Sequence, residues 1–434
     1  MTLKIKQFST QDSDFETRFA EALSRATQFD AGVDAKVRDI LDQVRLRGDE
    51  ALMELTAKYD GYFVKAADEL EIDEDRIQRA GERIEPTVDD ALRKASDRIR
   101  AFHERQLEQT WSFEEPDGSV YGQKISPLRS VGIYVPGGQA AYPSSVLMTA
   151  IPAKVAGVSQ VVMTVPAPGG QIRDSILAAA RIVGVDRVFA LGGAQAIGAL
   201  AFGTETVPRV DKIVGPGNAW VSAAKRQVFG YVGIDMVAGP SEVVVACDDP
   251  DNARWAAMDL FAQAEHDEDA QAILLSDSSD VIEKVKSEMA RMLPAMERKR
   301  IIARSLAEHG ALIEVRDRHE LIELIDRIAP EHLELMVEDP MTLAKFVRNA
   351  GAIFVGSYST EVLGDYCAGP NHVLPTSGSA RFTSPLGVYD YLKRTSIIAC
   401  SPSGGRRLAK TASVLAREEQ LSAHAASAEF RLDE

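Results

Sequence analysis

Short apolar runs, each followed by a glycine- or proline-rich turn and then a longer helical pattern, dominate the chain from about residue 130. The first series of predicted strands comprises 132–135, 161–165, 187–191, 212–214 and 234–237. The turns after them are PGG (136–138), PAPGG (166–170), GGAQ (192–195), GPGN (215–218) and GPSE (239–242). Strands that alternate with helices in this way indicate βαβ units, and hence a parallel sheet covered by helices.

The same pattern starts again after GPSE. Runs 243–246, 272–275, 311–315 and 352–355 are predicted strands, and helices are predicted near 250–265, 279–292 and 317–327. Residues 12–110 have helical periodicity, and one further helix is predicted near 405–420. We therefore expect an α/β protein with two tandem doubly wound, Rossmann-like parallel-sheet units, a helical N-terminal part and a small C-terminal extension. Ligands of such sheets bind at the carboxyl ends of the strands, where these turns lie.

Charge and cysteine content narrow the class of protein. The formal net charge is −16, which argues against nucleic acid or an anionic membrane as a partner, because both require a basic surface. The three cysteines include no Cys-x-x-Cys pair and fit a reducing cytoplasm better than a disulfide framework. The first residues lack the apolar core of a signal peptide, and no uncharged apolar run is long enough to span a membrane.

Standard nucleotide and hydrolase motifs are missing from the sequence. It contains no GxGxxG, GxxxxGK[ST], HExxH or GxSxG, and GPGN at 215–218 lacks the third glycine of a dinucleotide fingerprint. Turn chemistry alone therefore favours simple tight connections over phosphate-binding loops.

The histidines offer two candidate sites. Gln263 and His266 are three residues apart and would share a helix face, and Asp365 and His372 lie in the polar loop GDYCAGPNH. Histidine and carboxylate are ligands that zinc favours, although a single such pair is more often a surface contact. The adjacent Glu331–His332 could transfer protons, but residue chemistry alone favours a solvated loop.

Nine segments together resemble the histidinol dehydrogenase family, in the order that the family shows. They are GIYVPGG (132–138), YPSSVLM (142–148), GGAQAIGALAFGT (192–204), VDKIVGPGN (210–218), AGPSE (238–242), QAEHD (263–267), PEHLEL (330–335), GDYCAGPNHVLPT (364–376) and LSAHA (421–425). The resemblance covers nearly the whole chain. The visible departure is Cys367, where a small residue such as alanine is expected.

The resemblance implies a zinc- and NAD-dependent enzyme that oxidises L-histidinol to L-histidine in two hydride transfers. It implies Glu331 and His332 as catalytic residues. The implied zinc ligands are Gln263, His266, Asp365 and His424, and the last comes from the partner of an intertwined homodimer. The implied substrate contacts are Ser241, Gln263, His266, His332, Asp365, His372, Glu419 and His424. The implied NAD contacts are Tyr134, Gln195 and Asn218.

The resemblance also suggests how the chain is divided. We expect residues 1–25 to form an N-terminal extension at the dimer interface. A first α/β domain would combine residues 26–129 with 238–380, and residues 130–237 would form a second α/β domain on the NAD side. Residues 381–434 would form a tail that crosses to the partner subunit.

Histidine and carboxylate suit two successive proton transfers. The resemblance implies that His332 accepts the hydroxyl proton and that Glu331 activates the water that hydrates the aldehyde. Zinc would act as a template for the substrate. A thiohemiacetal on Cys367 remains an alternative route for the second step. Two other functions remain open: an alcohol dehydrogenase for another small polar alcohol, and a non-catalytic relative, although the six proposed catalytic and metal residues are all retained.

Overall fold

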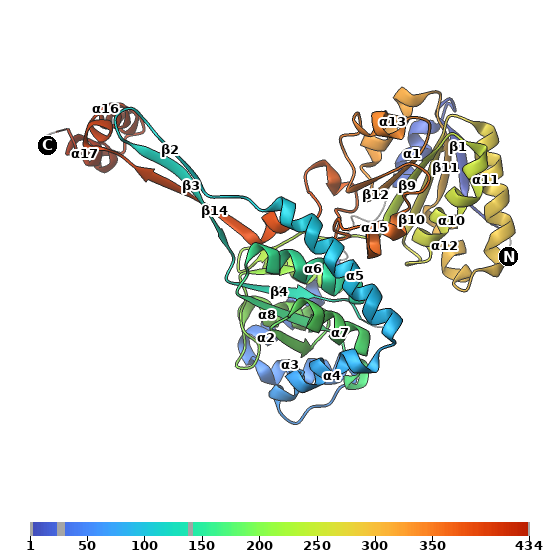
Figure 1. Ribbon diagram of the computed structural model, residues 1–434, viewed down its shortest axis with the longest axis horizontal. Helices are drawn as coiled ribbons and strands as arrows, with labels where there is room; N and C mark the ends of the chain where they lie inside the picture. Colours follow the sequence, from blue (N-terminus) through green and yellow to red (C-terminus); the bar gives the residue numbers. More distant parts are fainter. Residues whose placement is uncertain (1–2, 24–30, 138–141, 433–434) are drawn as a thin grey trace.

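The computed structural model describes residues 3–23, 31–137 and 142–432, and it shows two α/β units and an extended arm (Figure 1). Gly138 of the PGG turn and the expected domain boundary near residues 25 and 26 lie outside these described residues. None of the described helices is long and apolar enough to cross a membrane.

The first unit contains a six-stranded parallel sheet. Its strand order is β1 (Lys6–Ser9), β11 (Ala311–Glu314), β10 (Gln271–Ser276), β9 (Glu242–Cys247), β12 (His332–Met336) and β13 (Ala352–Val355). One face packs against α10 (Ala253–Ala264), α11 (Ser279–Met292) and α12 (Lys299–His309). The other packs against α1 (Phe15–Leu23), α13 (Arg318–Ile328) and α14 (Pro340–Ala344). Alternate residues of β9 from Val243 onward enter the two cores, which explains the uninterrupted apolar run 243–247.

The second unit contains a five-stranded parallel sheet. Its order is β6 (Arg187–Ala190), β5 (Gln160–Val165), β4 (Ser130–Tyr134), β7 (Lys212–Val214) and β8 (Gly233–Ile234). Helices α6 (Pro143–Ala156) and α7 (Asp174–Val183) cover one face, and α8 (Gly193–Phe202) and α9 (Ala219–Val228) cover the other. Both sheets share one order of successive strands, third-second-first-fourth-fifth, and β1 adds an edge strand to the larger. The predicted α/β class is confirmed.

The N-terminal helices are placed differently from the expectation. Helices α2 (Ala31–Arg47) and α3 (Asp49–Asp60) share the apolar core of α8 and α9, and α4 (Glu74–Arg83) and α5 (Pro86–His103) share that of α6 and α7. The expected grouping of residues 26–129 with 238–380 is therefore wrong for these helices. Their apolar stripes match the five-stranded unit, whereas β1 and α1 complete the six-stranded one.

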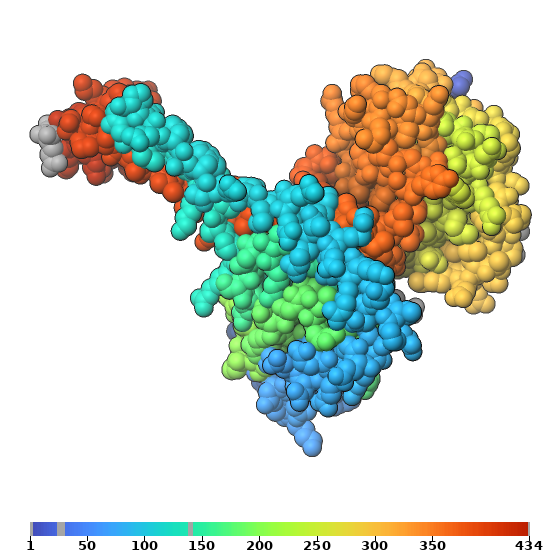
Figure 2. Space-filling model, viewed as in Figure 1, coloured from blue at the N-terminus to red at the C-terminus, as the bar shows by residue number. Residues whose placement is uncertain are grey.

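The arm is a three-stranded antiparallel ribbon that projects from the five-stranded unit (Figure 2). It consists of β2 (Trp111–Glu114), β3 (Val120–Pro127) and β14 (Leu392–Ala399), and it ends in α16 (Pro402–Glu418) and α17 (Ser422–Glu429). Sequence analysis predicted α16 but not the strands. Most of the β2 and β14 residues are exposed on both faces, so the ribbon lacks the apolar alternation that identifies a strand.

Candidate active site

Glu331 and His332 lie at the amino-terminal edge of the six-stranded sheet. His332 is the first residue of β12 and is paired with Val243 at the start of β9. This position corrects the expectation that the ligand site lies at the carboxyl ends of these strands. The side chains of the candidate site lie at the edge where β9 and β12 begin and where α10 ends.

Glu331 is buried, so the interpretation of this pair as a solvated loop is wrong. Its Oε2 accepts a hydrogen bond of 2.9 Å from the Glu242 backbone N–H and lies 3.7 Å from His332 Nδ1. Burial raises the pKa of Glu331 to about 8, because desolvation disfavours the carboxylate. A carboxyl group with a pKa near neutrality suits a general base.

The ring of His332 is held in one orientation. Its Nδ1–H donates to the Glu242 carbonyl oxygen at 3.0 Å, so in the neutral ring Nε2 carries the lone pair. Nε2 is buried and lies 3.5 Å from Asp365 Oδ1, too far for a well-formed hydrogen bond. Burial lowers the pKa of His332, but the carboxylates of Glu361, Glu331 and Asp365 outweigh it and raise the pKa well above its usual value.

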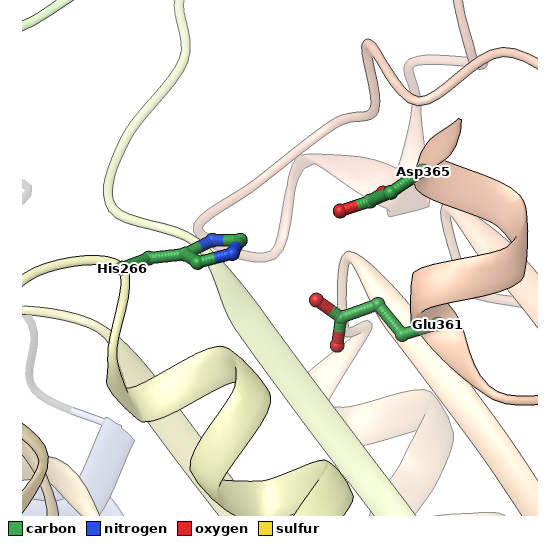
Figure 3. A group of neighbouring side chains, drawn as sticks. All are labelled: His266, Glu361 and Asp365. Carbon is green, nitrogen blue, oxygen red and sulfur yellow. The ribbon is translucent and has the colours of Figure 1, made fainter. Parts of the chain in front are cut away.

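Beside this pair lies a cluster of side chains with the chemistry of a metal site. His266 follows α10, and Glu361 and Asp365 belong to the short helix α15 (Glu361–Tyr366). Glu361 and Asp365 are four residues apart and point toward His266 (Figure 3). One ligand atom from each of these three residues lies within 4.8 Å of the others.

Gln263 completes this cluster from the last turn of α10, and it is fully buried. With the side-chain amide in one orientation, Nε2 lies 3.2 Å from His266 Nδ1 and the oxygen faces both Glu361 carboxylate oxygens. With the amide turned over, the NH2 group donates to Glu361 and the oxygen accepts from His266. The second orientation satisfies both groups, and the amide oxygen of Gln263 together with His266, Glu361 and Asp365 has the chemistry that fits a divalent metal.

Sequence reasoning missed Glu361. The residue is 2% exposed, and burial raises its pKa to about 8. The available signal was its spacing: in EVLGDY, Glu361 precedes Asp365 by four residues and therefore shares a helix face with it. The helix is only six residues long, which is too short for a periodicity search to detect.

Two predicted substrate contacts lie near this cluster. His372 Nδ1–H donates to the backbone carbonyl of Asp365 at 2.8 Å, and burial lowers the pKa of the His372 imidazole. Ser241 directly precedes β9, and its carbonyl accepts from Gln271 N–H at 3.0 Å. Both residues therefore lie at the same edge of the sheet as Glu331.

Two other predicted residues are not brought to the cluster within this chain. Glu419 follows α16 and His424 is on α17, and both are exposed. Figure 1 shows these helices at the far end of the arm, well separated from α10 and α15.

The three predicted NAD contacts share the carboxyl edge of the five-stranded sheet. Tyr134 ends β4, Gln195 is in the first turn of α8 after β6, and Asn218 caps α9 after β7. The Tyr134 hydroxyl accepts from Gly193 N–H at 3.1 Å, and Asn218 Oδ1 accepts from the Trp220 and Val221 N–H groups at 3.1 and 3.2 Å. This edge includes the reversal of strand order between β4 and β7, where doubly wound sheets bind ligands.

Comparison with known proteins shows the family to which the chain is similar. The family profile described as histidinol dehydrogenase matches residues 23–432. A histidinol dehydrogenase of Pseudomonas savastanoi pv. phaseolicola is 57% identical over 428 residues, which cover 99% of this chain and 96% of the relative. One from Methylococcus capsulatus is 55% identical over 430 residues and 99% of both chains. The crystal structure of histidinol dehydrogenase from Elizabethkingia anophelis superimposes with a TM-score of 0.93 at 31% identity, over 100% of this chain and 99% of that one. The chain therefore belongs to the histidinol dehydrogenase family.

Proposed function

We propose that the protein oxidises L-histidinol to L-histidine through the aldehyde, with two NAD+ as hydride acceptors. The observation that carries this proposal is the buried pair Glu331–His332 beside a cluster of metal-type ligands. An imidazole and a carboxylate at one site can perform two different proton transfers in sequence.

His332 serves the first oxidation. Its Nε2 accepts the proton of the substrate hydroxyl while hydride leaves the carbinol carbon for NAD+, which yields the aldehyde and NADH. The bond from Nδ1–H to the Glu242 carbonyl keeps the lone pair on Nε2 and aims it into the site.

Glu331 serves the second oxidation. Its carboxylate accepts a proton from water as the oxygen adds to the aldehyde carbon. The resulting hydrate then loses hydride to a second NAD+ and yields the carboxylic acid. The Glu242 N–H holds the Glu331 carboxylate in place, so this base need not reorganise during the reaction.

We propose zinc as the metal, held by Gln263, His266, Asp365 and, from the partner subunit, His424. When bound, zinc supplies a positive centre that orients polar groups of the substrate. Its charge would also offset the carboxylates that keep the His332 pKa high, which favours the neutral imidazole that a base requires. Ser241, His372 and the partner subunit's Glu419 would contact the substrate.

We propose a homodimer in which the arm of each chain reaches the active site of the other. Large apolar side chains on the arm are exposed, with 72% exposure for Ile398, 59% for Leu415 and 71% for Phe430. Side chains of this kind gain stability when a second copy covers them. The separation within one chain of α17, which carries His424, from α10, which His266 follows, supports the same arrangement (Figure 1).

NAD+ would bind at the carboxyl edge of the five-stranded sheet, through Tyr134, Gln195 and Asn218. We place the protein in the cytoplasm because Cys247, Cys367 and Cys400 are free thiols, as is usual in a reducing compartment.

The central test is a titration of the purified protein with L-histidinol, in which NADH is counted with and without a chelator. We expect two NADH per substrate and loss of turnover after removal of the metal. One NADH with accumulating aldehyde would refute the two-step reaction, and turnover of other small alcohols but not histidinol would indicate a different substrate.

The shared site is tested by mixing two variants that are each deficient in the complete two-step oxidation. Glu331→Gln and His424→Ala alter residues that the dimer would supply from different subunits. After subunit exchange, half the chains of each kind give about one intact site in four. Recovered activity supports the shared site, whereas a mixture as inactive as its components contradicts it.

A further inference from the structure

The segment 367–376 leads the chain from the six-stranded unit to the five-stranded unit. Helix α15, which precedes it, belongs to the six-stranded unit, where the Glu361 N–H donates to Glu334 of β12 at 2.6 Å (Figure 1). Val373 already lies in the apolar core of the five-stranded unit, together with residues of α5, α6 and α7. His372 therefore lies where the chain crosses between the unit that carries the catalytic pair and the unit at which we place NAD+.

Helix α5 of the five-stranded unit holds the first part of this segment. Arg98 Nε donates to the Cys367 carbonyl oxygen at 2.7 Å, and Arg98 Nη2 donates to the Ala368 carbonyl oxygen at 3.2 Å. Both acceptors are backbone atoms, so these hydrogen bonds fix the path of the chain ahead of His372.

The side chain of Asn371 anchors the residue directly before His372. Asn371 is 4% exposed. Its Nδ2 donates to the Met148 carbonyl oxygen of α6 at 2.6 Å, and its Oδ1 accepts from the Val373 N–H at 2.9 Å. The second bond joins the two residues on either side of His372. The amide thus ties the backbone around His372 to a helix of the five-stranded unit.

His103, the last residue of α5, offers the Asn371 amide a second acceptor. His103 Nδ1–H donates to the Ile99 carbonyl oxygen at 2.8 Å, so in the neutral ring Nε2 carries the lone pair, and it lies 3.3 Å from Asn371 Nδ2. The imidazole is fully buried, and burial lowers its pKa, which favours the neutral ring. The two protons of the Asn371 amide can therefore reach two different helices of the same unit.

The imidazole of His372 is held by the other unit. Its Nδ1–H donates to the Asp365 carbonyl oxygen of α15 at 2.8 Å, so in the neutral ring Nε2 carries the lone pair. The six-stranded unit thus orients the ring, while Asn371 fixes the backbone that carries it. The position of His372 consequently depends on contacts with both units.

On the basis of the substrate contact proposed above for His372, we propose that Asn371 is a positioning residue for substrate binding. Its amide sets where His372 meets L-histidinol relative to the unit that holds NAD+. Asn371 acts through His372 and contacts no reacting atom. Displacement of a positioning group by about 1 Å can cost roughly 100-fold in rate, so loss of this anchor should weaken substrate binding.

The test is a double-mutant cycle of Asn371→Ala and His372→Ala on the full-length enzyme loaded with metal. Steady-state kinetics give the KM for L-histidinol, and calorimetric titration gives the Kd for L-histidine. Gln227→Ala is the matched control, because Gln227 Nε2 also donates to a backbone carbonyl of the five-stranded unit, that of Asp34, at 3.0 Å. It should keep both constants at their wild-type values.

We expect Asn371→Ala to raise both constants by roughly 10-fold to 100-fold in the wild type. In the His372→Ala background the same change should have an effect of less than about threefold, because two residues that act through one contact are not additive. The KM for NAD+ should change little. Asn371→Ser should recover part of the loss, since its hydroxyl can still accept from the Val373 N–H.

Additivity decides between a positioning role and a structural one. If Asn371→Ala raises the constants by the same factor in both backgrounds, this inference is overturned while the substrate contact of His372 stands. If Asn371→Ala and Asn371→Ser only lower the melting temperature, as Gln227→Ala should, the inference is overturned as well. If His372→Ala leaves both constants unchanged, the proposed substrate contact is itself refuted, and the role of Asn371 is refuted with it.

Discussion

The ammonium group of Lys225 and the carboxylate of Asp235 form a buried ion pair that holds the peptide of Gly215 between them. Lys225 Nζ donates to the Gly215 carbonyl at 2.9 Å, and Asp235 Oδ2 accepts from the Gly215 N–H at 2.7 Å. Gly215 begins the GPGN turn, whose last residue is Asn218. The ion pair thus supports the turn at which we place NAD+.

Lys225→Met should destabilise the protein and weaken NAD+ binding. It leaves Asp235 buried without its counter-charge, which costs about 3–5 kcal/mol. Lys284→Met is the control, since Lys284 pairs with Asp280 at 3.0 Å on the surface and should cost less than about 1 kcal/mol. Urea unfolding measures stability, and the KM for NAD+ should rise more than kcat falls. An unchanged KM would contradict the role in the turn.

Gly215→Ala should damage the same turn through the backbone. Gly215 has φ 112°, and a Cβ there would collide with the Tyr134 carbonyl oxygen. Gly230→Ala is the matched control: its φ is 101°, and among the described residues no heavy atom lies within 4 Å of an added Cβ. The control measures the cost of backbone strain alone, which should lower the free energy of unfolding by about 1–3 kcal/mol. We expect a larger loss of melting temperature and weaker NAD+ binding for Gly215→Ala; equal effects would exclude the collision.

Glu331→Gln should separate the two oxidations. The amide keeps an oxygen that can accept from the Glu242 N–H, but it cannot accept a proton from water. We expect oxidation of added histidinaldehyde to fall by about 10²–10⁴-fold, the usual contribution of a general base. The first hydride transfer, followed in a single turnover by stopped-flow absorbance, should fall much less. Cys367→Ala is the companion test, and full loss of aldehyde oxidation there would restore the thiol route.

Because His103 is buried as a neutral imidazole, we expect the free energy of unfolding to fall at acid pH. It is buried on α5, where Nδ1–H donates to the Ile99 carbonyl at 2.8 Å and Nε2 lies 3.3 Å from the Asn371 amide nitrogen. Burial lowers the His103 pKa, so the unfolded chain takes up a proton first as pH falls below about 6.5. Its contribution to stability is therefore complete above that pH and is lost below it.

Unfolding in urea between pH 7.5 and 5 measures this effect. His103→Gln should be less stable than the wild type at pH 7.5 but should show a flatter dependence on pH. Parallel curves for the two proteins would assign the acid sensitivity to other groups.

The sequence by itself determined the α/β class and most of the core strands. Runs 243–246 and 272–275 lie within β9 and β10, because strands buried on both faces have near-continuous apolar runs. Resemblance selected Glu331, His332, Gln263, His266 and Asp365, and the structure gathers these residues at one edge of a sheet.

Tertiary structure decided what local pattern does not encode. Helices α2–α5 look alike in sequence whichever sheet they cover, and packing alone assigns them to the five-stranded unit. Glu361 lies almost a hundred residues from Gln263 in the chain, and only the fold brings their side chains to 3.2 Å. The edge on which the site lies, and the distance of His424 from it, likewise follow from long-range contacts. These contacts depend on burial and chain topology, which no short window of sequence specifies.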